Sequence, residues 1–250
     1  MIFVSDLDKT LIFSKRFLPS QNRLLLAELK DNLPVAFMAE DTFNNLKTFT
    51  EQGGIFIPAT ARTLEQYKRI FLFDFLDIKY EIICNGKTIL KNGEIVQEWE
   101  DEMNKKLETL PVSISELLKE IKIFADIHTP EVEKTYYCYD NYLAIISFKN
   151  KEDLTNEFIE LLNNKIKDTG WVSFACGRKL YISSNFIDKS YAVDYINKYL
   201  LDKPTQIVAS GDSLYDLQML ELADYPIIPK HAEIADKLHT TKNSFYEASM

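Results

Sequence analysis

Two acidic residues, Asp6 and Asp8, stand one residue apart near the start of the chain, in Asp6-Leu7-Asp8-Lys9-Thr10. They follow residues 2–4, a short β-branched and aromatic run that predicts a buried strand, so both carboxylates are expected to face a common ligand at a sheet edge. Phosphoryl transfer can use such a pair, because one carboxylate acts as nucleophile while the other donates and later accepts a proton. A loop with capping acids explains this motif equally well when it is taken alone.

Thr60 and Lys189 are the next candidates for contact with a phosphate group. Thr60 follows a second predicted strand and offers a hydroxyl to a phosphate oxygen, although an isolated threonine there also suits a turn or a helix cap. Lys189 stands just before a predicted helix, where its ammonium could neutralise a nucleophilic carboxylate and the charge that develops on phosphorus. Taken alone, Lys189 is more simply explained as a surface lysine.

Asp212 and Asp216 supply a candidate metal site near the C-terminus. Asp212 lies in Ser210-Gly211-Asp212-Ser213, after the apolar run at residues 206–209. At the edge of a sheet its carboxylate would be a hard oxygen ligand of the kind that Mg²⁺ prefers. Asp216, one turn further on, could orient that ligand.

These candidates follow short apolar segments that alternate with helical patterns. Strands are predicted at 2–4, 54–58, 81–84 and 206–209, and helices at 41–52, 63–71, 190–199 and 215–222. Such alternation predicts an α/β fold with a doubly wound, Rossmann-like parallel sheet. Because ligands of these sheets bind at the carboxyl ends of the strands, the acidic and hydroxyl residues are expected to meet there.

The middle of the chain has a different pattern. Residues 87–99 contain Lys91-Asn92-Gly93 between two apolar runs, which predicts a β-hairpin. Helical stretches follow from residue 101, strands are predicted within 136–148 and 171–182, and a helix at 151–167 lies between them. Since 128 residues separate Thr60 from Lys189, an inserted α+β domain of about 90 residues is expected.

As a set, these residues resemble the four motifs of the haloacid dehalogenase superfamily. The matching positions are Asp6-x-Asp8-x-Thr10, Thr60, Lys189 and Gly211-Asp212-x3-Asp216. The resemblance implies that Asp6 becomes phosphorylated, that Asp8 is the general acid and base, and that Thr60 and Lys189 hold the phosphoryl group. It also implies that Mg²⁺ is bound by Asp6, the main-chain carbonyl of Asp8 and Asp212, with Ser213 and Asp216 supporting the metal site.

The place of the insertion resembles the type C2 cap of the Cof-like and sucrose-phosphatase-like branch. Cys84-Asn85-Gly86 falls where that branch carries an Asn-Gly turn, so Asn85 is a candidate for substrate contact. The resemblance implies a core of residues 1–86 and 180–250, and a cap of residues 87–179 that selects the substrate. Ala61 and Arg62 are further candidates for phosphate or substrate binding, and Arg62 would either pair with a second anionic group or brace its loop.

Three features depart from the common pattern of this superfamily. Lys9 stands where many relatives have glycine, and Tyr215 replaces a frequent asparagine before the last acid. The segment 14–39 is longer than the usual connection and is expected to form a flap or hairpin over the site. The loop of Asp8 and the support of the metal site are therefore expected to differ in detail.

The composition argues against several classes of protein. A formal net charge of −9 and a pI near 5.0 argue against broad nucleic-acid binding, which needs a basic face. Three widely spaced cysteines form no metal or redox pair. No apolar run approaches the roughly 18 residues of a membrane span, and the acidic N-terminus does not resemble a signal peptide. We expect a cytoplasmic protein, and its oligomeric state stays open.

The predicted function is that of a Mg²⁺-dependent phosphomonoester hydrolase. Its substrate would be a small phosphorylated metabolite, with sugar phosphates as one candidate class, and the reaction would pass through a phosphoaspartate on Asp6. Two alternatives stay open, namely a phosphomutase that shares this step and a non-catalytic homologue that binds a phosphorylated ligand. The presence of both Asp6 and Asp8 argues against the non-catalytic alternative, since loss of either would disable turnover and leave only a phosphate pocket.

Overall fold

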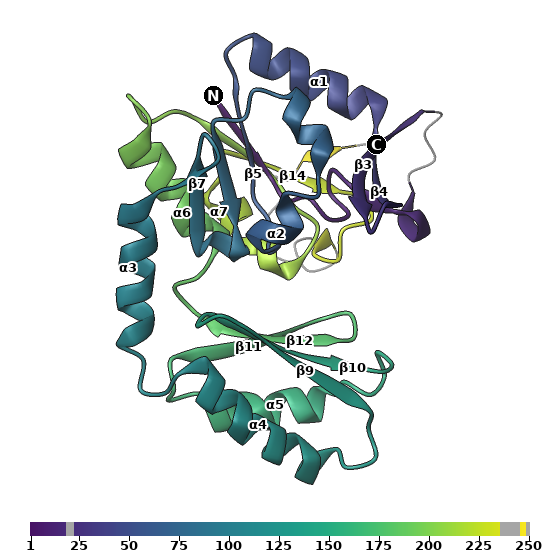
Figure 1. The fold of residues 1–250 in the computed structure, drawn as a ribbon, viewed down its shortest axis with the longest axis vertical. Coiled ribbons are helices and arrows are strands. Elements are labelled where there is room, and N and C mark those ends of the chain that lie inside the picture. Colours follow the sequence, from purple (N-terminus) through teal and green to yellow (C-terminus); the bar gives the residue numbers. More distant parts are fainter. Residues whose placement is uncertain (19–22, 236–245, 249–250) are drawn as a thin grey trace. The chain divides into compact units, whose positions relative to one another are not determined.

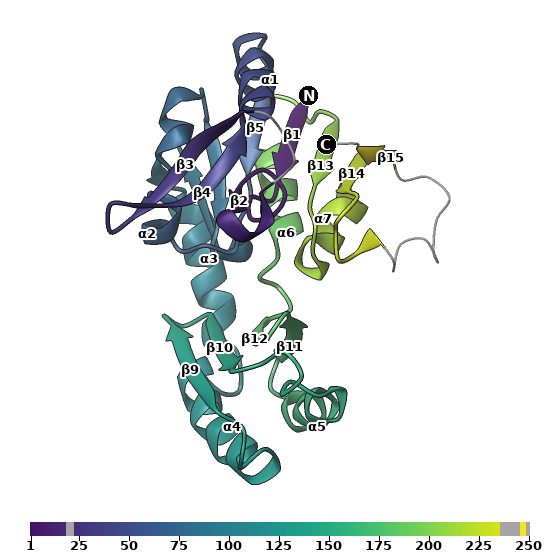
Figure 2. The same cartoon turned by 90° about the vertical axis from the view of Figure 1, so that its right-hand side faces the viewer.

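The computed structural model describes residues 1–18, 23–235 and 246–248, and the chain divides into two compact units (Figure 1 and Figure 2). Unit 1 comprises Met1–Glu100 and Asp188–Met250, and unit 2 comprises Asp101–Ile187. Unit 2 is therefore an insertion between the two sequence segments that build unit 1.

A five-stranded parallel sheet forms the centre of unit 1, in the order β15-β14-β13-β1-β5. The strands are β1 (Ile2–Ser5), β5 (Ile55–Pro58), β13 (Ile207–Ser210), β14 (Tyr225–Pro229) and β15 (Tyr246–Ala248). Most apolar residues of β1, β5 and β13 are buried, as expected for a parallel sheet that is covered on both faces.

The strand order reverses at β1, because β5 lies on one side of it and β13 and β14 lie on the other. Helix α1 (Glu40–Glu51) precedes β5, whereas α6 (Lys189–Tyr195) and α7 (Leu217–Leu222) precede β13 and β14. Since such crossovers are right-handed, α1 covers one face of the sheet, and α6 and α7 cover the other. This arrangement confirms the predicted doubly wound α/β fold, in which ligands bind at the carboxyl ends of the strands beside the reversal.

The segment 14–39 contributes most of a small antiparallel sheet with the order β2-β4-β3. Its strands are β2 (Phe13–Ser14), β3 (Leu24–Lys30) and β4 (Leu33–Ala39). Asp31 and Asn32 join β3 to β4 with left-handed backbone angles, φ 51° and φ 60°, as a tight two-residue hairpin turn requires. The predicted hairpin in this segment is therefore present, although residues 19–22 lie outside the described part of the chain.

The strand predicted at 81–84 does not join the parallel sheet as expected. It is β6 (Tyr80–Ile83), which pairs antiparallel with β7 (Thr88–Lys91), and β7 pairs in turn with β8 (Glu94–Ile95). The turn at Asn92 and Gly93, with φ 54° and φ 77°, reverses the chain between β7 and β8. On its other edge, β6 meets the residues that follow β5 through a parallel bridge from Ala59 to Ile82 and a hydrogen bond from Thr60 N to Ile82 O at 2.8 Å.

The remaining helical segments of unit 1 are short. Helix α2 (Leu64–Tyr67) is shorter than the helix predicted at 63–71, and Thr63 caps it through a capping box with Gln66. Single 3₁₀ or π turns occur at Lys15–Phe17, Phe71–Phe75, Cys84–Gly86, Ile196–Leu200 and Leu214–Asp216. None of the helices in the described ranges is both long and apolar enough to cross a membrane.

Unit 2 is a four-stranded antiparallel sheet with two helices on one face (Figure 2). Its helices are α4 (Ile114–His128) and α5 (Asn156–Ile166), and its strands are β9 (Lys134–Tyr139), β10 (Leu143–Phe148), β11 (Trp171–Cys176) and β12 (Lys179–Ser184). The sheet order is β11-β12-β10-β9. This α+β composition agrees with the insertion that the sequence predicts.

The boundaries of unit 2 differ from the predicted limits of 87 and 179. Strands β7 and β8 pair with β6 and so belong to unit 1, and helix α3 (Gln97–Glu108) carries the chain across the boundary. On the return, β12 pairs with β10 and β11, which keeps residues up to Ile187 in unit 2. At both limits, hydrogen bonding between neighbouring strands decides to which unit a segment belongs.

Candidate active site

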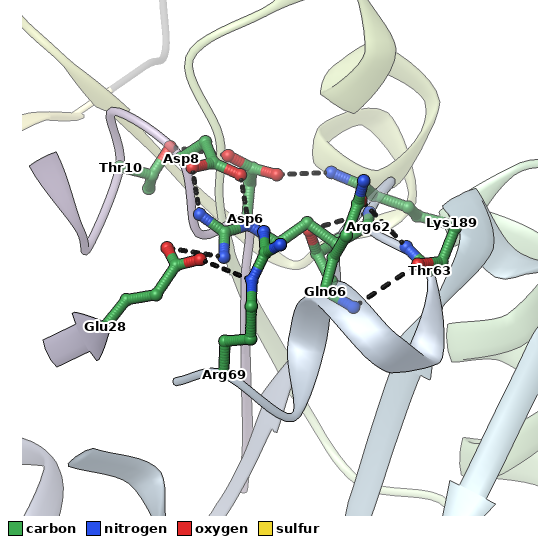
Figure 3. A network of polar contacts seen from close by, with 10 residues as sticks. Asp6, Asp8, Thr10, Glu28, Arg62, Thr63, Gln66, Arg69 and Lys189 are labelled. Carbon is green, nitrogen blue, oxygen red and sulfur yellow. Dashed lines mark hydrogen bonds and ion pairs between the residues drawn. The ribbon is translucent and has the colours of Figure 1, made fainter. Parts of the chain in front are cut away.

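Asp6 lies at the carboxyl end of β1, beside the reversal of strand order, and is only 7% exposed. Its main-chain N–H donates to the carbonyl of Ser210 at 2.9 Å, which ties the loop after β1 to β13. Lys189 Nζ donates to Asp6 Oδ1 at 2.6 Å, and the Thr10 hydroxyl donates to Asp6 Oδ2 at 3.2 Å (Figure 3). The carboxylate is therefore held in one orientation by a cation and a hydroxyl.

Lys189 is buried rather than exposed at the surface, with 1% of its area accessible. Its ammonium lies between two carboxylates, because Nζ also donates to Asp216 Oδ1 at 2.6 Å. The start of α6 positions it: the Asp188 side chain caps the helix by accepting the Ser190 N–H at 2.8 Å. The surface-lysine alternative is therefore wrong.

Asp6, Asp212 and Asp216 form an acidic cluster whose carboxylate oxygens lie within 4.8 Å of one another. Asp216 uses both oxygens within the protein, since Oδ1 binds Lys189 and Oδ2 accepts from Ser213 N (3.0 Å) and Ser213 Oγ (2.8 Å). The Asp212 carboxylate accepts no hydrogen bond from the described residues, although the main-chain carbonyl of Asp212 accepts from Ile234 N at 3.3 Å. Three carboxylates beside one ammonium leave two negative charges in excess, and hard oxygen donors of this kind fit Mg²⁺.

The pKa values of Asp6 and Asp212 are raised by burial and, to a smaller extent, by neighbouring carboxylates. Burial raises the pKa of Asp6 to about 8, although Lys189 opposes this change, and Asp216 and Asp8 contribute to the rise. Burial and then Asp216 raise the pKa of Asp212 to about 6. Burial acts to lower the pKa of Lys189, but Asp216 and Asp6 outweigh it and raise that pKa above its usual value. A bound divalent cation would favour the ionised carboxylates.

Two glycines allow the loops of the site to approach closely. A Cβ on Gly211 would lie 2.3 Å from Asp216 Cβ, so only glycine lets Asp216 pack against the loop of Asp212. A Cβ on Gly86, whose φ is +97°, would lie 2.3 Å from the carbonyl oxygen of Asp188. The turn at Cys84–Gly86 can therefore lie directly against the residue before Lys189.

Lys9 keeps the backbone conformation that a glycine would adopt, with φ 64°. A non-glycine residue in this region costs roughly 1–2 kcal/mol. Local hydrogen bonds hold it there: Lys9 N donates to Ile12 O at 2.8 Å, and His231 Nε2 donates to the Lys9 carbonyl at 2.6 Å. Lys9 therefore takes a left-handed backbone conformation in the loop that carries Asp8.

The side chain of Asp8 is 56% exposed and is held by Arg62. Arg62 Nε donates to Asp8 Oδ2 at 2.8 Å and Nη2 donates to Asp8 Oδ1 at 2.7 Å, which is a bidentate pair (Figure 3). Of the two roles predicted for Arg62, the structure shows contacts that brace its own loop and the neighbouring acid.

Thr60, Ala61 and Asn85 lie in two loops that are joined by main-chain hydrogen bonds. Asn85 N donates to Thr60 O at 2.9 Å, and Cys84 N donates to Arg62 O at 2.8 Å. Thr60 is buried, and its Oγ1 accepts the Arg62 N–H at 3.2 Å. Ala61 is partly exposed and has no polar side chain to offer, so any contact with a ligand would come from its backbone.

Glu28 and Arg69 belong to the same network but were not predicted from the sequence. Glu28, on β3, is 3% exposed and accepts from Arg62 Nη1 at 2.9 Å and from Arg69 Nε at 2.9 Å (Figure 3). The only sequence signal was one acidic residue after the apolar run at 24–27. His231 also contacts the Asp8 loop, through the Lys9 carbonyl.

Comparisons with known proteins agree with this geometry. The sequence model for haloacid dehalogenase-like hydrolases matches residues 118–241, which include Lys189, Asp212 and Asp216. No curated protein sequence matches the chain.

Several solved structures share the fold of the whole chain. Sucrose-phosphatase from Synechocystis, in complex with sucrose and phosphate, has a TM-score of 0.67 at 16% identity, covering 100% of this chain and 91% of its own. A haloacid dehalogenase-like hydrolase from B. subtilis has a TM-score of 0.59 at 16% identity, with coverages of 98% and 94%. A phosphatase of the same superfamily from Bacteroides thetaiotaomicron has a TM-score of 0.56 at 13% identity, with coverages of 98% and 89%.

At these identities the solved structures establish the fold alone. Within residues 118–241 the chain is similar to the haloacid dehalogenase-like hydrolases, and the whole chain shares the fold of solved proteins of that kind.

Proposed function

We propose that this protein is a Mg²⁺-dependent phosphomonoester hydrolase that acts on a small phosphorylated metabolite, with Asp6 as the nucleophile. The observation that carries this proposal is the buried Asp6 carboxylate, held by Lys189 and Thr10 beside Asp212. Sucrose-phosphatase, which shares the fold, was crystallised with sucrose and phosphate, and this makes sugar phosphates one candidate substrate class.

The acidic cluster supplies the ligands for the metal. Asp6, Asp212 and the main-chain carbonyl of Asp8 would hold Mg²⁺. Asp216, whose oxygens are bound by Ser213 and Lys189, would support this site. Bound there, the ion would offset the repulsion between the Asp6 carboxylate and an anionic phosphate group.

In the first step, an Asp6 oxygen attacks phosphorus, and a new O–P bond forms as the ester P–O bond breaks. The leaving oxygen takes a proton from Asp8, so the product departs as a neutral alcohol. The Lys189 ammonium offsets the negative charge of the transferring group, and Thr60 supplies a hydroxyl to one of its oxygens. Asp6 ends the step as an acyl phosphate.

In the second step, water attacks the phosphorus of the phosphoaspartate. Asp8, now ionised, accepts a proton from this water, and the bond between phosphorus and the Asp6 oxygen breaks. The step returns the Asp6 carboxylate, protonated Asp8 and inorganic phosphate. Arg62 donates one hydrogen bond to each Asp8 oxygen, and each oxygen keeps a second lone pair that can take a proton.

Phosphate release from a panel of phosphorylated metabolites, with and without Mg²⁺, tests the proposal. The native chain should release phosphate only with the metal, and Asp6→Asn should lower the rate by about four orders of magnitude or more. Asp224→Asn is the matched control, since Asp224 binds Ile207 N at the opposite end of β13, and it should keep native activity. Equal rates for the native chain and Asp6→Asn would contradict the proposed mechanism.

A further inference from the structure

We propose that Glu28 is a positioning residue for proton transfer by Asp8, and that it acts through Arg62. The inference rests on the proposed hydrolase function and adds to it a residue from the hairpin formed by β3 and β4. Glu28 is not expected to touch the substrate.

An unbroken series of ion pairs connects Glu28 to Asp8 (Figure 3). The Glu28 carboxylate binds Arg69 with Oε1 and Arg62 with Oε2, each at 2.9 Å. The same Arg62 guanidinium then donates two hydrogen bonds, of 2.7 and 2.8 Å, to Asp8. Two guanidinium groups thus meet two carboxylates, and the set carries no net charge.

A β-bulge in β3 directs Glu28 toward this network. The pairing of β3 with β4 shifts register on both sides of Glu28, between Leu26 and Glu28 and again between Glu28 and Leu29. Regular alternation would send neighbouring side chains to opposite faces, but Ala27 and Glu28 are both buried, at 0% and 3% exposure. A bulge re-aims side chains in this way and is common next to active sites.

The planar guanidinium of Arg62 connects Glu28 to the orientation of the Asp8 carboxylate. Arg62 has 13% of its side chain exposed and uses Nη1 for Glu28, while Nε and Nη2 face Asp8. Because these nitrogens lie in one rigid plane, the contact with Glu28 fixes the direction of the two bonds to Asp8. Burial acts to lower the pKa of Arg62, but the carboxylates of Asp8 and Glu28 raise it, so the group stays charged. Loss of Glu28 would leave the plane free to tilt.

The consequence for the reaction depends on the leaving group. An alkyl phosphate releases a strongly basic alkoxide, so breaking its ester bond needs a proton from a well-placed Asp8. p-Nitrophenyl phosphate releases a stable phenolate and needs this proton far less. A residue that positions Asp8 should therefore matter for the first ester and much less for the second.

The test compares kcat/KM of Glu28→Gln with that of the native enzyme on both esters. The alkyl phosphate is the one that the native enzyme hydrolyses fastest in the panel. We expect a loss of about tenfold on the alkyl phosphate, within the range of general acid catalysis, and of less than about threefold on p-nitrophenyl phosphate. Asp224→Asn serves again as the control and should lower neither value. Affinity for orthovanadate with Mg²⁺ should stay within about twofold, because Asp6, Thr60 and Lys189 hold that group.

A second comparison separates positioning from a general loss of structure. In an Asp8→Asn background, Glu28→Gln should cause no further loss, because the group that it positions is already absent. If Glu28→Gln does not fold, Arg69→Gln takes its place. That variant removes the other partner of Glu28 and should give a smaller loss, of about threefold, confined to the alkyl ester.

Equal losses on both esters, or an undiminished loss in the Asp8→Asn background, would overturn the role of Glu28. Phosphate release by the native chain would still support the proposed function in that case. Absence of phosphate release by the native chain would instead contradict the proposed function itself, and the positioning role with it.

Discussion

Asp6 and Asp8 are separated by one residue in the same loop, yet they differ in burial, in the cation that binds them and in the part of the chain that supplies it. Asp6 is buried and is held by Lys189 at the start of α6, within a cluster of three carboxylates. Asp8 is half exposed and is held by Arg62, which follows β5. The proposed mechanism uses this difference, with the buried carboxylate attacking phosphorus and the exposed one exchanging a proton with water.

The two sides also differ in which part of the chain supports them. The Asp6 side depends on residues 188–216, which the chain reaches only after the inserted unit. The Asp8 side chain depends on the hairpin of β3 and β4 and on the segment after β5, all within the first 70 residues, although His231 also contacts its loop. Changes on one side should therefore leave the other side's contacts in place.

The largest expected effect on stability comes from removing Lys189, the cation that pairs with the buried Asp6 and Asp216. Lys189→Met would leave Asp6 and Asp216 without their ammonium, and breaking a buried pair in this way costs about 3–5 kcal/mol. The loss should increase as pH rises through the raised pKa of Asp6, since the ionised carboxylate then lacks its partner. Urea unfolding at several pH values measures it.

Arg62→Met makes the matching change beside Asp8, the more exposed of the two acids, and its loss of stability is compared with that of Lys189→Met. It should cost less, because Asp8 is solvated and Glu28 keeps Arg69. An equal or greater loss for Arg62→Met would show that burial does not distinguish the two sides.

The next expected effect is on the Mg²⁺ requirement, which should differ between variants of Asp212 and Asp216. Asp212→Asn should raise the Mg²⁺ concentration needed for half-maximal activity by about 10–100-fold, because Asp212 offers its oxygens to the ion. Asp216→Asn should change this requirement less and lower stability more, since both Asp216 oxygens are used by Lys189 and Ser213. Magnesium titrations of the two variants make the measurement, and the opposite ranking would assign the ion to Asp216.

The smallest expected effect on stability concerns Glu81, a carboxylate that has no ion-pair partner among the described residues. Burial raises the pKa of Glu81 to about 6. A raised pKa means that the ionised form destabilises the fold, so stability is greatest at low pH and falls as pH rises through about 4.5 to 6. Glu81→Gln should therefore raise the free energy of unfolding by about 1 kcal/mol at pH 8, discounted for partial exposure, and by almost nothing at pH 4. A uniform effect at both pH values would show that charge is not the cause.

The Asp6 side of this comparison could be predicted from the sequence. Short apolar strands that end in polar residues place those residues at one sheet edge, so Asp6 and Asp212 were expected near one another. For Lys189, only the resemblance to the superfamily implied a place beside them. The Asn-Gly turn at residues 92 and 93 was also predictable, because few other pairs adopt its backbone angles.

The Asp8 side was much less accessible to sequence analysis. The inward direction of Glu28 depends on a bulge that breaks the regular alternation of β3, and nothing in the run Leu24–Lys30 signals that bulge. Strand β6 was predicted in the parallel sheet, but it pairs antiparallel with β7 and is joined to the residues after β5 by a single bridge. Residue pattern predicts elements and their ends better than it predicts pairing and register.

Trapping the covalent intermediate tests the central claim most directly. The Asp8→Asn chain, which should form the acyl phosphate but hydrolyse it slowly, is mixed with Mg²⁺ and p-nitrophenyl phosphate and quenched in acid. Borohydride reduction followed by peptide mass spectrometry should then locate homoserine at position 6, and the Asp6→Asn/Asp8→Asn chain should show none. Modification at another residue, or turnover without any trapped phosphoaspartate, would contradict the assignment of Asp6 as the nucleophile.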